Sequence, residues 1–170
     1  MMKRLAVVAL LALATPAQAQ EATIDPDHIV SVLKDAGYPA EYLNSGADFR
    51  QILTKVGQRQ FLVELYDCTD RKACETMEFT AEFPMEEPPT NDAISAYSGP
   101  HEGARVALDR RGKPTMAMEI DIPDEGLSDT QFIAHMKSWE TMIAAFLDFL
   151  THPPREAPAA PAVATAAPTS

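Results

Sequence analysis

The sequence lacks the short motifs that mark the common catalytic and metal-binding sites. It contains no C-x-x-C, no H-E-x-x-H and no G-x-S-x-G, which argues against a thioredoxin-like redox centre, a zinc protease and an α/β-hydrolase. Its four histidines, His28, His101, His135 and His152, lie on separate predicted elements without metal-ligand spacing. The sequence therefore predicts no catalytic residue, no metal site and no cofactor.

Long hydrophobic runs are also scarce. The longest covers residues 5–14, whereas a bilayer of about 30 Å hydrocarbon thickness needs roughly 20 apolar residues. This run follows Lys3 and Arg4 and precedes an A-Q-A segment that ends at Ala19, which is the order of a secretory signal. We expect residues 1–19 to be a signal peptide cleaved after Ala19, leaving a soluble periplasmic or secreted protein without membrane insertion.

Basic residues are few. The chain has 14 Lys and Arg against 25 Asp and Glu, a net charge of −11. Loss of Lys3 and Arg4 with the signal leaves 12 basic residues, so the mature charge becomes 12 − 25 = −13. Such a field repels phosphate backbones and anionic lipids, which argues against nucleic acid as a partner. It favours basic partners, or it serves solubility alone.

The rest of the chain divides into one domain and a tail. Residues 152–170 are rich in proline and alanine and hold almost no large apolar side chain, so we expect a disordered tail or spacer. Residues 23–151 are long enough to bury a single hydrophobic core. They contain no internal repeat.

Helix signals occur at three places. Asp25 and Pro26 begin a short helix with apolar residues at three-and-four spacing, and Gly37 ends it. Thr90 is placed to cap a second helix. Ser128 and Gln131 form a capping box before an apolar-periodic helix of about 20 residues.

Strand signals fill the gaps between these helices. Three predicted strands precede the second helix, at residues 49–56, 61–67 and 75–83, and two follow it, at residues 105–108 and 115–122. Residues 44–48 are predicted to form a turn. The order helix, three strands, helix, two strands, helix predicts an α+β fold. In it, an antiparallel sheet of about five strands packs against three helices.

The only two cysteines, Cys68 and Cys74, bracket the loop between the second and third predicted strands. In an exported protein this pair predicts a structural disulfide. If the two cysteines face each other, opposite residue numbers on the two strands sum to 142. The core face then holds Phe61, Val63, Leu65, Met77, Phe79 and Ala81.

The same register places Glu64 directly opposite Glu78. Like charges at facing positions are destabilising, which leaves a bulge or a one-residue offset near the loop as an alternative. The methionines at 77, 85, 116 and 118 have the softness that copper prefers, but alternate strand positions favour a role as core filler. The acidic residues at 121, 124 and 125 lack the spacing of a calcium loop.

The pattern from residue 29 to residue 150 resembles the YbjN-type domain, a bacterial family labelled sensory transduction regulators. The resemblance is carried by L-K-D-A-G-Y at 33–38, F-L-V-E-L-Y-D-C at 61–68 with Cys74, Pro89-Thr90, Leu108-Asp109 with Gly112, and F-L-D-F-L at 146–150 after Trp139. It implies a fold similar to type III secretion chaperones, with the element order given above. It also implies a non-enzymatic role, a homodimer, and another polypeptide as the partner.

The chain departs from the family in the predicted middle helix. The family favours Asn, Trp and Asn there, followed by Arg and an aromatic residue, whereas this chain has Ser95, Tyr97, Ser98, Glu102 and Gly103. The aromatic residue is kept in kind, and the polar pair and the Arg are absent. The residues that we assign to a partner-binding surface are Tyr97, Tyr66 and Leu62.

Three functions follow as hypotheses. The first is a non-enzymatic exported protein of the YbjN type that acts as a protein-binding, chaperone-like or regulatory module. The alternatives are a hydrolase or lyase with a dispersed acidic site, and a structural envelope protein. An enzyme of that kind requires converging carboxylates in a cleft, whereas a binding module requires an exposed apolar groove or an open strand edge.

Overall fold

The computed structural model describes residues 23–98 and 103–152. They form a six-stranded antiparallel sheet in the order β1-β2-β3-β4-β6-β5, together with three helices. The predicted α+β class is confirmed, with one strand more than the five expected. The predicted signal peptide and the tail beyond His152 lie outside the described residues.

The three helices begin where the capping signals place them. Helix α1 (Pro26–Asp35) has Asp25 as its N-cap, and α2 (Asn91–Ser98) is capped by Thr90, whose Oγ1 accepts a hydrogen bond from Ala93 N at 3.2 Å. Helix α3 (Asp129–Thr151) begins at the predicted Ser128–Gln131 capping box. None of these described helices is long and apolar enough to cross a membrane.

The sixth strand is the one that the sequence did not predict. Strand β1 includes Asn44 and Ser45, so the turn that we had assigned to residues 44–48 was wrong for these two residues, whereas residues 46–48 do connect β1 to β2. It is a short edge strand whose register shifts between Tyr42 and Asn44, so it has no clear alternation of apolar and polar residues. The strands are β1 (Glu41–Ser45), β2 (Arg50–Val56), β3 (Arg59–Tyr66), β4 (Thr76–Glu82), β5 (Arg105–Leu108) and β6 (Pro114–Ile120).

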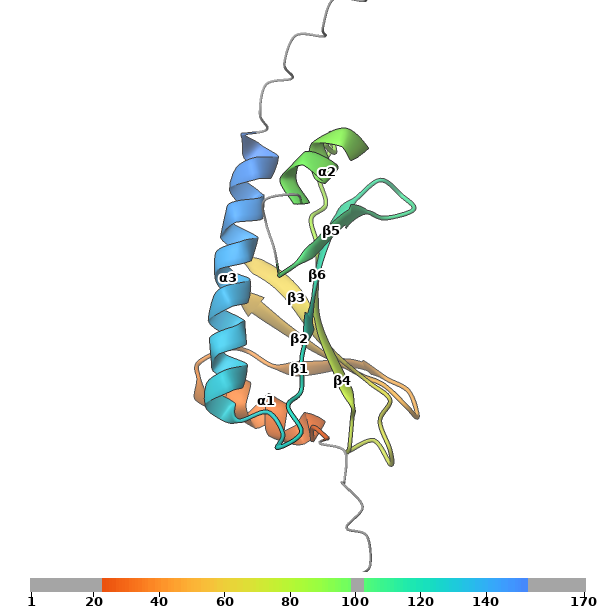
Figure 1. The fold of residues 1–170 in the computed structure, drawn as a ribbon, viewed down its shortest axis with the longest axis vertical. Helices are drawn as coiled ribbons and strands as arrows, with labels where there is room; N and C mark the ends of the chain where they lie inside the picture. Colours follow the sequence, from red (N-terminus) through yellow and green to blue (C-terminus); the bar gives the residue numbers. More distant parts are fainter. Residues whose placement is uncertain (1–22, 99–102, 153–170) are drawn as a thin grey trace, which may run out of the picture.

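The sheet has one covered face and one open face. Helix α3 runs along one face, α1 lies on the same side, and α2 packs near β5 at one end (Figure 1). Within the part of the chain that the structure describes, no helix covers the opposite face (Figure 1). The alternating burial of β4 and β6 agrees with this arrangement, because every second side chain is buried against the helices.

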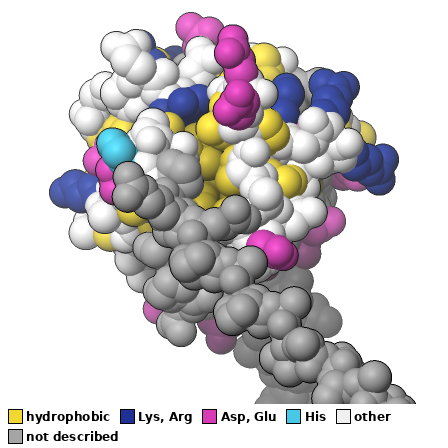
Figure 2. Space-filling view, turned by 90° about the horizontal axis from the view of Figure 1, so that it is seen from above, with side chains coloured by type: hydrophobic (Ala, Val, Ile, Leu, Met, Phe, Trp, Pro, Cys, Tyr) yellow, Lys and Arg dark blue, Asp and Glu magenta, His cyan; other side chains and the backbone are white. Residues whose placement is uncertain are grey.

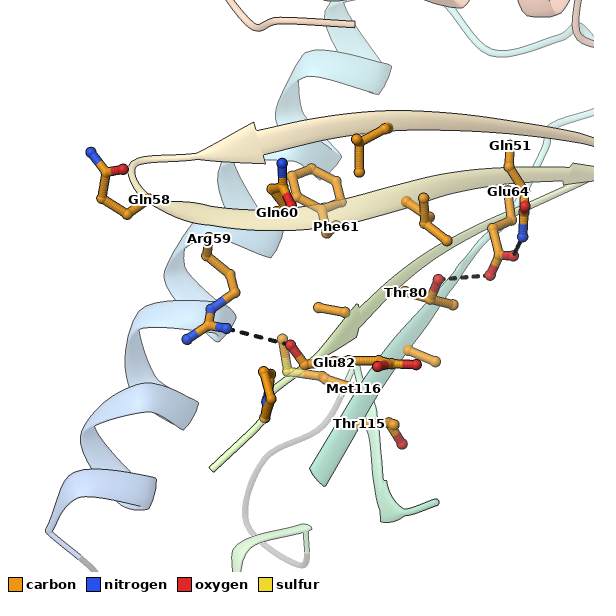
Figure 3. Close-up of a pocket in the computed structure, with 15 residues that line it drawn as sticks. Gln51, Gln58, Arg59, Gln60, Phe61, Glu64, Thr80, Glu82, Thr115 and Met116 are labelled. Carbon is orange, nitrogen blue, oxygen red and sulfur yellow. Dashed lines mark hydrogen bonds between the residues drawn. The ribbon is translucent and has the colours of Figure 1, made fainter. Parts of the chain in front are cut away.

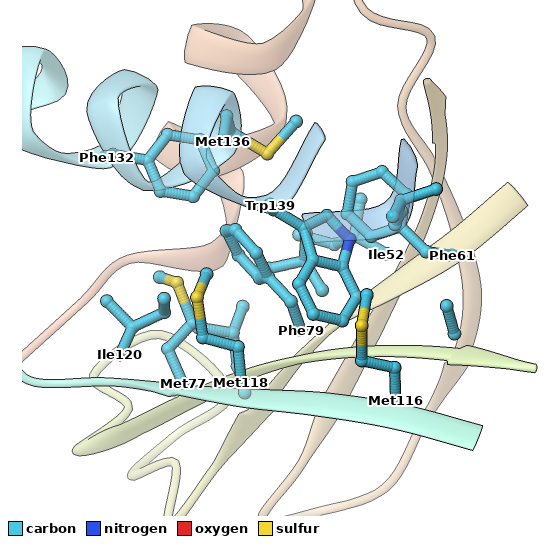
Figure 4. Packing of buried hydrophobic residues seen from close by; sticks show 14 of the residues in the cluster. Ile52, Phe61, Met77, Phe79, Met116, Met118, Ile120, Phe132, Met136 and Trp139 are labelled. Carbon is cyan, nitrogen blue, oxygen red and sulfur yellow. The ribbon is translucent and has the colours of Figure 1, made fainter. Parts of the chain in front are cut away.

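Aromatic side chains fill the core between α3 and the sheet. The ring of Phe79 lies 5.9 Å from that of Trp139 and 5.8 Å from that of Phe61, measured between centroids (Figure 4). Such pairs contribute about 0.5–1.5 kcal/mol each beyond the burial of their area. Met77, Met116 and Met118 are also buried here, which confirms that they are core filler. The same prediction was wrong for Met85, which is 38% exposed.

The hairpin of β3 and β4 has the predicted register. Val63 faces Phe79, Glu64 faces Glu78 and Leu65 faces Met77, with no bulge between them. The predicted core face is buried on both strands. One predicted pair is wrong: Phe61 does not pair with Ala81, because the two strands have separated before they reach these residues.

Candidate functional site

The sheet splits between β3 and β4. Their pairing ends at Leu62 and Thr80, although β3 starts at Arg59 and β4 continues to Glu82. Beyond this point β3 stays with β2, and β4 stays with β6, so the two pairs diverge (Figure 3). Each strand therefore has a short stretch of backbone without a partner strand on the side of the split.

Arg59 reaches across the split. Its Nη1 donates a hydrogen bond to the backbone oxygen of Glu82 at 3.5 Å, and its Cζ lies 5.0 Å from the centre of the Phe83 ring (Figure 3). A hydrogen bond of this length is weak. Arg59 thus makes a weak contact between the two diverging strand pairs, which we call the loose tie.

A hollow of about 680 Å³ opens at the split on the open face of the sheet. Its size falls within the range of known ligand pockets. Because the strands have separated, the buried residues Phe61, Ala81 and Met116 line it together with outward-facing residues. The rest of the lining is mixed. It combines the apolar residues Leu53, Leu62, Pro84 and Ala117 with the polar and charged residues Gln51, Gln58, Arg59, Gln60, Glu64, Thr80, Glu82 and Thr115.

Hydrophobic side chains are also exposed at one end of the molecule. At the end where α2 and the C-terminal end of α3 lie, they gather in the middle of the view, with Lys and Arg side chains on both sides (Figure 2). Met85, which is 38% exposed, is one of three large hydrophobic side chains that are exposed among the described residues. A surface with apolar area between cations and polar groups is typical of an interaction site.

A row of three glutamates crosses the open face beside the hollow. Glu64 on β3, Glu78 on β4 and Glu119 on β6 stand directly opposite one another. Glu64 is only 9% exposed and accepts hydrogen bonds from Gln51 Nε2 at 2.7 Å and Thr80 Oγ1 at 2.6 Å. These bonds explain how the facing pair Glu64 and Glu78 is tolerated without the bulge that we had considered.

Arg105 on β5 offsets part of the remaining charge. Its Nη2 donates to Glu78 Oε1 at 2.8 Å. Among the residues that the structure describes, the exposed side chain of Glu119 makes no hydrogen bond or ion pair, and the same is true of Asp121. Both line a second hollow of about 570 Å³, which also contains Ala117 from the first.

Two of the three residues assigned to a partner-binding surface lie on the open face. Leu62 and Tyr66 both point outward from β3, and Leu62 lines the first hollow. Burial, the negative charge of Glu64 and a hydrogen bond to it raise the pKa of Tyr66 to about 12. Tyr97 lies elsewhere: it is 8% exposed and packs against Phe146 and Phe149 of α3.

The residues at which this chain departs from the family have local roles in α2. The hydroxyls of Ser95 and Ser98 donate to the carbonyl oxygens of Asn91 and Ile94 in the same helix. Ser98 and Gly103 also line the second hollow, whereas Glu102 lies outside the described residues.

The other end of the β3–β4 hairpin is closed. Cys68 and Cys74 form the predicted disulfide, and Cys74 also exchanges two backbone hydrogen bonds with Ile24, at 2.8 and 2.9 Å. The hairpin end is therefore tied to the N-terminal segment of the described chain. Within the described residues, no three His, Cys, Asp or Glu side chains gather in a way that would hold a metal ion.

This site has only a partial signal in the sequence. The facing Glu64 and Glu78 indicated that acidic residues gather on one face, but Glu119 joins them only because β4 pairs with β6. Arg59 and Ala117 carry no motif, and their position at the hollow depends on where the strands separate.

A protein-family model described as "Putative bacterial sensory transduction regulator" matches residues 25–152. The match covers most of the chain and nearly all of the residues that the structure describes. No significant match is found among curated proteins or among solved structures. The likeness to type III secretion chaperones therefore stays a prediction.

Proposed function

Since the chain belongs to the YbjN family, we propose that it is a non-enzymatic binding module that holds an extended segment of another polypeptide on the open face of its sheet. The family is described as regulatory and not as a class of enzyme. The observation that carries the proposal is the split between β3 and β4. It combines a partly apolar hollow with stretches of strand that lack a partner strand, and extended polypeptides recognise such features.

The lining of the hollow suits a peptide. Gln51, Gln58 and Gln60 offer amide donors and acceptors for a peptide backbone, and Leu53 and Leu62 offer apolar contact to its side chains. The buried residues Phe61, Ala81 and Met116 add further apolar lining to the hollow.

We also propose that the protein works outside the cytoplasm. The signal-like N-terminus and the disulfide support export, because disulfides persist in oxidising compartments. The predicted homodimer stays a prediction. The exposed Leu43 on the edge strand β1 offers a place where self-association would leave the open face free.

Site-directed photocrosslinking tests the proposal. A photoreactive amino acid placed at Leu62 should give adducts with another polypeptide in the producing cell, identified by mass spectrometry. The matched control replaces Ser138, which is exposed on α3 away from the sheet, and it should give no such adduct. Recovery of only the protein's own dimer from the Leu62 position would contradict the proposal.

A further inference from the structure

We infer that the open face selects a cationic extended segment, in which a bulky apolar side chain enters the hollow at the split and a Lys or Arg two residues away lies over the glutamate row. This inference rests on the proposed function and adds the chemistry of the partner. It is carried by two observations: the partly compensated carboxylates at the hollow, and the residue that lines both hollows.

The first observation is that the carboxylates are only partly compensated. Glu64, Glu78, Glu119 and Asp121 all lie on or beside the open face, and the structure pairs one of them, Glu78, with the guanidinium of Arg105. Arg105 is 72% exposed in its side chain, so this pair is strongly screened by water. A negative potential therefore remains over this part of the face.

The second observation is that the two hollows adjoin each other. Ala117 lines both, and its side chain is small. Glu119 follows Ala117 by two residues on the same face of β6, a separation of about 6.8 Å in an antiparallel strand. Side chains at positions i and i+2 of an extended peptide have the same spacing and point to the same side.

These spacings define the partner. A peptide with its apolar residue in the first hollow places the residue two positions away beside Glu119 and Asp121. A Lys or Arg there gains charge complementarity, whereas an Asp or Glu adds a like charge. The net charge of −11 acts in the same direction, because it repels anionic partners.

Binding of synthetic peptides tests the inference. The probe is a short fluorescent peptide that repeats leucine, threonine, lysine and threonine, so that leucine and lysine share one face. In one matched peptide glutamate replaces lysine, and in another alanine replaces leucine. By fluorescence anisotropy at low salt, the lysine peptide should bind about tenfold more tightly than the glutamate peptide, and the difference should shrink as salt is added.

Two sets of protein variants separate the site from its selectivity. Ala117→Trp places a large ring where the two hollows adjoin and should abolish binding of the lysine peptide. Ala107→Trp, on the same face but outside both hollows, should not abolish it. Glu119→Gln with Asp121→Asn should weaken binding of the lysine peptide by about threefold or more. Glu125→Gln, exposed and outside both hollows, should have no effect.

The failures are distinguishable. If Ala117→Trp blocks binding but the lysine and glutamate peptides bind equally, the inference fails and the proposed function stands. If no peptide binds the wild-type protein, both fail. If light scattering finds a dimer that Ala117→Trp converts to a monomer, the occupant of the face is a second copy, and the inference is overturned.

Discussion

The two ends of the β3–β4 hairpin are closed in different ways. At one end the Cys68–Cys74 disulfide links the two strands, and two hydrogen bonds between Cys74 and Ile24 tie the hairpin to the N-terminal segment. At the other end the ladder stops at Leu62 and Thr80, and one long hydrogen bond from Arg59 spans the gap. The same pair of strands is thus covalently linked at one end and unpaired at the other.

The core beneath the open end should be the most sensitive part of the molecule. Trp139 is fully buried and its ring contacts Phe61 and Phe79. Trp139→Ala should lower the free energy of unfolding by about 3–5 kcal/mol, because it leaves a large cavity. Urea denaturation of the oxidised protein measures this loss. Ser138→Ala, an exposed neighbour on α3, should change stability by less than about 0.5 kcal/mol.

Opening the closed end should have the next largest effect. Replacing Cys68 and Cys74 by serine should lower the free energy of unfolding by about 2–3 kcal/mol, because the unfolded chain loses a short covalent loop. Urea denaturation of the wild-type protein with and without reductant measures the same loss of unfolding free energy. Two free thiols in exported protein purified without reductant would contradict the role of this bridge.

Removing the loose tie at the open end should have a smaller and local effect. Arg59→Ala should raise amide hydrogen exchange near Phe61 and Ala81 by less than about fivefold, since weak surface contacts contribute under about 1 kcal/mol. Exchange at Leu65 and Met77, toward the disulfide, should not change. A uniform increase along both strands would mean that the two ends are not independent.

The smallest effect concerns Tyr66, which lies toward the closed end. Its pKa is raised from 10.0 to about 12, so the folded state holds the phenolic proton after the unfolded state has lost it. This contribution to stability is present below about pH 10 and is lost as the pH rises toward 12. The phenolate absorbance of the wild type minus that of Tyr66→Phe should titrate near pH 12. Titration near pH 10 would contradict the burial and the Glu64 contact.

The sequence predicted the closed end well and the open end poorly, for physical reasons. Two cysteines and a strict alternation of apolar residues determine the register near the loop, since a slip by one residue would expose the core face. The point where β3 leaves β4 has no such local signal. It depends on the twist of the sheet and on how β2 and β6 each hold their neighbour.

Two other features, strand β1 and the position of Tyr97, could not be predicted from local sequence patterns. Strand β1 is short, irregular and at an edge, so it was not predicted, and its last two residues were assigned to a turn. Tyr97 matches a family position that suggested a surface role, whereas the packing of α2 on α3 turns its ring toward Phe146 and Phe149. Leu62 and Tyr66 were placed on the correct side of β3 by alternation alone.

The most direct test of the central claim is a comparison of Ala117→Trp with Ala107→Trp in peptide binding. We expect the first substitution to abolish binding of the leucine and lysine peptide and the second to leave it unchanged, with both proteins equally folded by circular dichroism. Equal binding by the two variants would show that the split between β3 and β4 is not the docking site.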